Sequence, residues 1–229
     1  MQDFLNKIGI VPNNILLYEQ AFVHRSFINE NPKFHLGHNE RLEFLGDAVL
    51  ELIVTDFLYN KYPDRPEGDL TSYRSALVNT HALGDVSKGL GFNNYLQLSK
   101  GESRDKESRA RLSILADTYE AVLGAIYLDL GYLACEDFVV KTLLPYTEDI
   151  VKNNLFKDAK SFVQEMAQEK IQITPIYKLL QESGPDHNKI FTVGIYFDDK
   201  LIAEGKGNSK QLAEIEAAKN AIIKKGWSN

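Results

Sequence analysis

The pattern of apolar residues changes once along this chain, and this change constrains the fold more than any other feature. From residue 15 to residue 146, apolar residues recur at intervals of three and four, the period of α-helices that bury one face. After Thr147 a polar stretch containing Asn153 and Asn154 leads to one further helix and then to residues that alternate or favour β-strands. The sequence therefore predicts a helical domain followed by a smaller mixed domain.

Clusters of Gly, Pro and Asn separate the predicted elements of both domains. In the first domain, helices are predicted at residues 15–22, 40–59, 67–79, 81–90, 113–130 and 132–144. The second has the order α-β-β-β-α, with helices at 159–170 and 209–225 and strands at 176–181, 191–197 and 201–205. The predicted fold is an all-α domain at 1–152, a linker at 153–157, and an α+β domain at 158–229. In the latter, a three-stranded antiparallel sheet carries two helices on one face.

Charge is distributed unequally between the two parts. The net charge of the chain is −6; residues 1–155 hold 15 Lys and Arg against 22 Asp and Glu, whereas residues 156–229 hold 11 against 10. The acid surplus is thus entirely in the helical part, either as solvated helix faces or as a divalent-cation site. No apolar run reaches the roughly 18 residues of a membrane span. Because Cys135 is the single cysteine, no internal disulfide forms, and we expect a reducing cytoplasmic location without membrane contact.

The acids of two predicted helices have a spacing that gathers them on one face. Glu40, Glu43 and Asp47 stand at positions i, i+3 and i+7, and Asp117 and Glu120 at i and i+3. Carboxylates crowded on a half-buried face repel one another unless a cation compensates their charge. Mg²⁺ prefers such hard oxygen ligands and often takes substrate phosphate as a further ligand. The spacing alone leaves open whether these acids bind a cation or simply face solvent.

The residues around these acids resemble two motifs of the ribonuclease III family. Residues 39–48, NERLEFLGDA, resemble the signature of the family, and residues 113–121, SILADTYEA, resemble its second catalytic motif. The resemblance implies a metal-binding catalytic cluster of four acids: Glu43, Asp47, Asp117 and Glu120. Glu120 would be the most direct ligand of Mg²⁺, for which Mn²⁺ would be able to substitute. Glu40 and Glu67 match acids that line the catalytic valley, with structural or interface support as the alternative role.

This family cleaves double-stranded RNA, and the resemblance implies the same activity here. Water would attack phosphorus to leave 5′-phosphate and 3′-hydroxyl ends, and a homodimer with one cluster in each subunit would leave short 3′ overhangs. Ribosomal RNA precursors and structured messenger RNAs are the substrates that the family suggests. The alternative is a catalytically silent dimer that binds duplex RNA.

The second domain resembles a double-stranded RNA-binding domain in its element order and in two motifs, GPDH at 184–187 and GNSK at 207–210. Such modules read the shape of A-form RNA through minor-groove hydroxyls and phosphates. The residues that the resemblance places against RNA are Gln164, Glu165, His187, Ser209 and Lys210. Gln211 replaces a second lysine that is common in relatives, so salt-sensitive binding is expected.

The polar segment before the second acidic motif carries two further candidates for RNA contact. Arg109 and Arg111 are predicted to contact phosphates, with solvation of the loop as the alternative. Here Glu107 and Ser108 stand where bacterial relatives often have two glycines, which predicts a less bendable loop.

Overall fold

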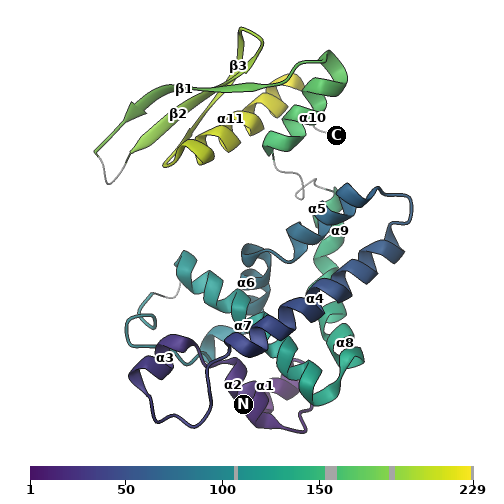
Figure 1. Cartoon of the computed structure of the whole chain (residues 1–229), viewed down its shortest axis with the longest axis vertical. Coiled ribbons are helices and arrows are strands. Elements are labelled where there is room, and N and C mark those ends of the chain that lie inside the picture. Colours follow the sequence, from purple (N-terminus) through teal and green to yellow (C-terminus); the bar gives the residue numbers. More distant parts are fainter. Residues whose placement is uncertain (106–107, 153–158, 186–188, 228–229) are drawn as a thin grey trace. The chain divides into compact units, whose positions relative to one another are not determined.

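The computed structural model of the chain describes residues 1–105, 108–152, 159–185 and 189–227. Its contacts divide into two compact units, Met1–Phe156 and Lys157–Asn229 (Figure 1), each with its own hydrophobic core. The predicted linker at 153–157 lies outside the described residues, so the predicted domain limits stay a prediction.

The first unit consists of helices and short 3₁₀ turns, which confirms the predicted all-α class. Its elements are α1 (Gln2–Lys7), α2 (Ile15–Ala21), α3 (Arg25–Glu30), α4 (Glu40–Lys61), α5 (Glu67–Leu77), α6 (Thr80–Gly89), η1 (Phe92–Asn94), α7 (Arg109–Leu130), α8 (Tyr132–Thr142), η2 (Leu144–Tyr146) and α9 (Thr147–Lys152). The sequence does not predict α1, α3 and α9, because helices of six residues are too short to show a clear apolar period.

Helix α7 forms the centre of the first unit (Figure 1), where α4, α6 and α8 pack against it. Twelve of its 22 residues are buried, and they lie on nearly all sides of the helix. The helix begins at Arg109, earlier than predicted, because the Ser108 hydroxyl accepts a hydrogen bond from the Arg111 backbone N–H and caps the first turn. The acids of α7 are therefore carried on the element that the core holds most firmly.

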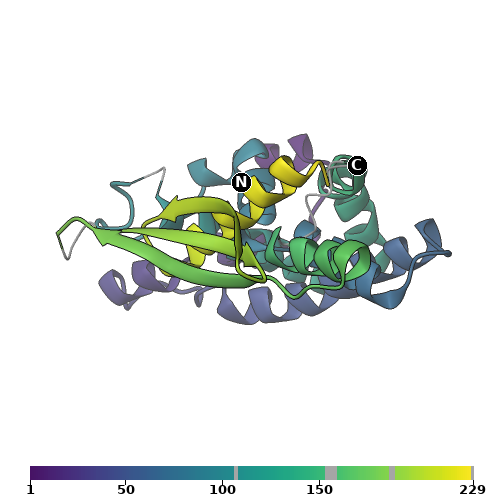
Figure 2. The same cartoon turned by 90° about the horizontal axis from the view of Figure 1, so that it is seen from above.

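The second unit has the predicted α-β-β-β-α order. Its elements are α10 (Ala159–Ile171), β1 (Ile176–Ser183), β2 (Ile190–Phe197), β3 (Lys200–Gly207) and α11 (Lys210–Lys225). The strands pair antiparallel in the order β1-β2-β3, side by side in Figure 2. Both helices cover one face of the sheet, where Val163 and Ala167 of α10 share a core with small residues of α11. A Cβ atom added to Gly205 would overlap the backbone at Ala217, so glycine lets α11 lie directly against β3.

Within the residues that the structure describes, every helix is too short or too polar to serve as a membrane span.

Candidate active site

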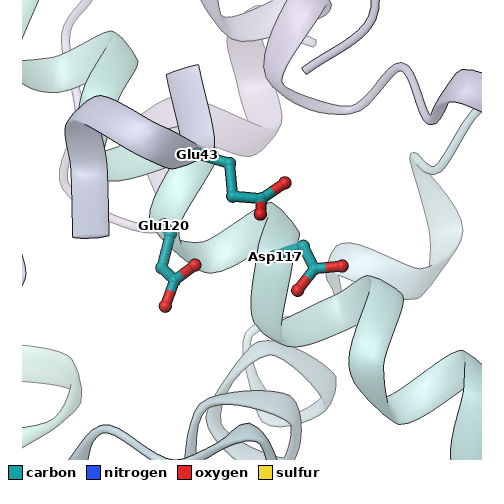
Figure 3. A group of neighbouring side chains, drawn as sticks. All are labelled: Glu43, Asp117 and Glu120. Carbon is teal, nitrogen blue, oxygen red and sulfur yellow. The ribbon is translucent and has the colours of Figure 1, made fainter. Parts of the chain in front are cut away.

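Three carboxylates from two helices converge on one point in the first unit. Glu43 stands on α4, and Asp117 and Glu120 stand beside it on α7 (Figure 3). One oxygen of each side chain lies within 4.8 Å of an oxygen of the other two. Oxygen ligands of an octahedral Mg²⁺ stand about 2.1 Å from the ion and hence roughly 3–4 Å apart, so small side-chain movements would bring these oxygens to such an ion.

Two glycines allow α4 and α7 to come close enough for this convergence. A Cβ atom added to Gly46 would overlap the backbone carbonyl of Glu120, and one added to Gly124 would overlap the carbonyl of Leu42. The two helix backbones therefore touch where the acids lie, and any larger side chain at either glycine would separate them. The glycine of the signature motif thus sets the distance between Glu43 and the two acids of α7.

The electrostatics of the cluster favour proton or cation binding. Burial, followed by the charges of Asp117, Glu40 and Asp47, raises the pKa of Glu43 to about 7. Burial and the charges of neighbouring acids, with Asp47 first, raise the pKa of Glu120 to about 8. Burial also raises the pKa of Asp117. Near neutral pH the raised pKa values therefore oppose full ionisation of the cluster, and a divalent cation would compensate the charge of its carboxylates.

Asp47 and Glu40 flank the three convergent acids on α4. The Asp47 side chain is exposed and stands outside the group of three, although its charge raises the pKa of both Glu43 and Glu120. Glu40 pairs with Arg25, the Nη1–Oε1 distance being 3.3 Å. The ligand role of Asp47 and the supporting role of Glu40 stay predictions.

Glu51 is a further acid of this face that the sequence analysis missed. It stands four residues after Asp47, so continuing the acidic spacing along the helix identifies it. Its charge contributes to the raised pKa of Glu120, and its carboxylate pairs with Arg74 of α5 at 2.8 Å.

Glu67 begins α5 and is exposed to solvent. Within the described parts of the chain, its carboxylate is not among the charges that raise the pKa of Glu43 or Glu120. The predicted role of Glu67 in the catalytic valley therefore has no support from contacts within one subunit and stays a prediction.

The two arginines at the start of α7 differ in their surroundings. The Arg109 side chain is exposed, in keeping with the predicted phosphate contact. Arg111 is only 3% exposed, and its guanidinium donates hydrogen bonds to the backbone carbonyls of Glu102 and Asp105. This burial disagrees with the predicted phosphate contact of Arg111, because the side chain is used to hold the preceding loop against α7.

Three of the predicted RNA-binding residues of the second unit lie on its helices. Gln164 and Glu165 are exposed on α10, and Lys210 is exposed at the first position of α11. The Ser209 hydroxyl accepts a hydrogen bond from the Leu212 backbone N–H and caps α11. His187 lies outside the described residues.

Comparison with known proteins agrees with this division. Residues 14–147 match the family model described as ribonuclease-III-like, and residues 159–225 match the double-stranded RNA binding motif. The chain is similar to ribonuclease 3 of Streptococcus gordonii, with 42% identity over 97% of this chain and 95% of the relative. Ribonuclease 3 of Dehalococcoides mccartyi is 44% identical over 94% of this chain and 90% of the relative.

A solved structure has the same fold as the first unit. The nuclease domain of ribonuclease III from Campylobacter jejuni superposes with a TM-score of 0.55 and 32% identity, covering 62% of this chain and 94% of that one. Both family models, these relatives and the convergence of the motif acids lead to one assignment: the chain belongs to the ribonuclease III family of double-strand-specific endoribonucleases, and its second unit is a double-stranded RNA-binding domain.

Proposed function

We propose that this chain is a Mg²⁺-dependent endonuclease that hydrolyses double-stranded RNA to 5′-phosphate and 3′-hydroxyl ends. The observation that carries this proposal is the convergence of Glu43, Asp117 and Glu120 within 4.8 Å at the point where the two family motifs meet. A protein that only bound RNA would gain nothing from carboxylates whose pKa values are raised and whose charge repels phosphate.

The donor set favours a hard divalent cation. Glu43, Asp117 and Glu120 would hold Mg²⁺, with Asp47 as a proposed fourth ligand and with Mn²⁺ able to substitute. Bound there, the ion would neutralise the phosphate and lower the pKa of the attacking water. The protein would hold the carboxylates at a fixed spacing through the contact of α4 with α7 at Gly46.

Exposed residues of both units would bind the duplex. Gln164 and Glu165 on α10 would face a minor groove, and Lys210 with the capped start of α11 would meet phosphates. Arg109, exposed at the start of α7, would contact the RNA backbone near the acids. Such contacts recognise the shape of the duplex more than its sequence. The proposed substrates, precursors of ribosomal RNA and structured messenger RNAs, follow from family membership.

A homodimer would cut both strands and leave short 3′ overhangs. The relevant surface is on α4, where Phe44 is 81% and Leu52 57% exposed, an unusual position for large apolar side chains. The related domain of Campylobacter jejuni has a region involved in dimer formation. A two-fold dimer would place two acidic clusters on a two-fold duplex. A cytoplasmic location stays a prediction.

The test is a denaturing-gel assay of long duplex RNA and of its separate strands, with and without Mg²⁺. The wild type is expected to cut only the duplex and only with the metal, and Glu120→Gln to bind the duplex without cutting it. Glu148→Gln is the matched control, because this acid on α9 has a 61% exposed side chain and takes no part in the cluster. A wild type that binds duplex RNA but leaves it whole under Mg²⁺ and Mn²⁺ would instead support a catalytically silent RNA-binding dimer.

A further inference from the structure

Four acids of α4 form a row, and the acid at each end of the row forms an ion pair with one arginine. Glu40, Glu43, Asp47 and Glu51 follow one another at intervals of three and four residues, so they lie along one face of the helix. Glu40, at one end, pairs with Arg25, and Glu51, at the other end, pairs with Arg74. Within the described ranges, no lysine or arginine lies at ion-pair distance from Glu43, Asp117 or Glu120. The arginines thus neutralise the ends of the row and leave its centre negative.

The Arg74 side chain is held in place by two successive turns of α4. Its Nε donates to Glu51 Oε2 at 2.8 Å, and its Nη1 donates to Thr55 Oγ1 at 2.9 Å. The guanidinium is planar and presents its donors at fixed angles, so these two bonds together fix its orientation. Arg74 is therefore a positive charge fixed at the α5 side of the acidic row.

The Glu51–Arg74 pair affects the cluster through its charge. Both side chains are more than a third exposed, and ion pairs with this exposure contribute little to stability. Glu51 nevertheless stands one helical turn from Asp47, on the same face of α4 as Glu43. Loss of Arg74 would leave Glu51 as an additional free negative charge beside the cluster, whereas loss of Glu51 would leave a free positive charge there.

We propose that Arg74 is a positioning residue that sets, through Glu51, the affinity of the acidic cluster for its divalent cation. This inference rests on the proposed metal-binding function of Glu43, Asp117 and Glu120. Its distinguishing consequence is a change of opposite sign for the two partners: Arg74→Gln should tighten cation binding, and Glu51→Gln should weaken it. A pair with only a structural role would change cation binding in the same direction in both variants, or in neither.

The experiment is a Mg²⁺ titration of the full chain without RNA, at pH 8.5 and low ionic strength, followed by calorimetry. Relative to the wild type, we expect Arg74→Gln to lower the dissociation constant for Mg²⁺, and Glu51→Gln to raise it, by about threefold to tenfold each. The double variant should return to within about twofold of the wild type, because it removes both charges. Arg74→Lys keeps the charge and should also remain near the wild type.

Arg65→Gln is the matched control for Arg74→Gln, because Arg65 precedes α5 and pairs at 3.6 Å with Asp69 of α5 rather than with an acid of the row. This control should leave Mg²⁺ binding unchanged. If both single variants shift the dissociation constant in the same direction, or if Arg74→Gln has no effect on it, the inference is overturned. If the wild type itself shows no Mg²⁺ binding, the proposed metal site fails and the inference fails with it. If the wild type binds Mg²⁺ and cleaves duplex RNA, but the two single variants do not shift the dissociation constant in opposite directions, the inference fails while the proposed function stands.

Discussion

Replacing Glu120 with glutamine is expected to stabilise the metal-free protein while it abolishes cleavage. Burial and four neighbouring acids oppose the charge of Glu120, which is the reason for its raised pKa. A carboxyl group with a higher pKa in the folded than in the unfolded chain binds more protons when folded. Its contribution to stability is therefore fully present below the unfolded pKa and is lost as pH rises through the folded pKa. Glutamine carries no charge and does not undergo this loss.

The size of the effect follows from the two pKa values. The difference between 4.5 and about 8 at Glu120 corresponds to about 5 kcal/mol at 1.36 kcal/mol per pH unit. Solvent reaches this half-buried site and screens the charges, so we expect a net gain of about 1–2 kcal/mol at pH 9. In a unit of this size such a gain raises the melting temperature by roughly 3–6 °C. At pH 5 the gain should be close to zero.

Differential scanning calorimetry with EDTA at pH 5, 7 and 9 measures the melting temperature of the first unit. The two units have separate cores, so their unfolding transitions can be followed separately. Trp227, the single tryptophan, lies in the core of the second unit. Its fluorescence therefore follows the unfolding of that unit, which should be unchanged by Glu120→Gln. Glu148→Gln again controls for the loss of a carboxylate on α9, outside the cluster.

Either of two results would refute this reasoning. A Glu120→Gln variant that is less stable than the wild type at pH 9 would mean that the carboxylate stabilises the empty cluster. A gain of equal size at pH 5 and pH 9 would mean that the substitution acts through packing rather than charge. Addition of Mg²⁺ should reduce the difference in melting temperature between the variant and the wild type, because the ion stabilises the wild type more than the variant.

Three other variants test the fold, the RNA contacts and the dimer. Gly46→Ala should destabilise the first unit by about 3 kcal/mol or more, since the methyl group overlaps the carbonyl of Glu120. Chemical denaturation measures this loss, and an unchanged free energy of unfolding would contradict the prediction. Lys210→Ala should weaken duplex binding and reduce by about one the slope of log K against log salt, measured by fluorescence anisotropy; an unchanged slope would exclude a phosphate contact. Phe44→Asp should convert the proposed dimer to a monomer with unchanged circular dichroism, and sedimentation that still shows a dimer would place the interface elsewhere.

The sequence predicts the longer helices of the first unit but not which of its acids meet. Spacing along α4 places Glu43 and Asp47 on one side of the helix, whereas the structure joins only Glu43 to the α7 acids in the group of three. The rotation and separation of the two helices decide this, and they depend on backbone contact at Gly46 and Gly124. Such contacts are a tertiary property that the apolar period does not encode.

Two further differences arise from interactions between distant parts of the chain. Arg111 has the charge expected of a phosphate contact, but its guanidinium donates hydrogen bonds to two backbone carbonyls of the preceding loop. The Arg74–Glu51 pair joins α5 to α4, so no motif of either helix alone reveals it. The partners of both arginines therefore follow from packing between elements that are distant in the sequence.

The position of α7 explains why the acids of the cluster stay close together despite their like charges. Like charges on a flexible segment would move apart, which would lower their repulsion and return each pKa toward its ordinary value. Here Asp117 and Glu120 stand on a helix buried on nearly all sides, and α4 touches its backbone at Gly46, so neither helix can withdraw without opening the core. Burial, together with this repulsion, therefore raises the pKa of Glu43 and Glu120. A cation entering this cluster finds its ligands already positioned, and the core of the first unit supplies the energy that holds them there.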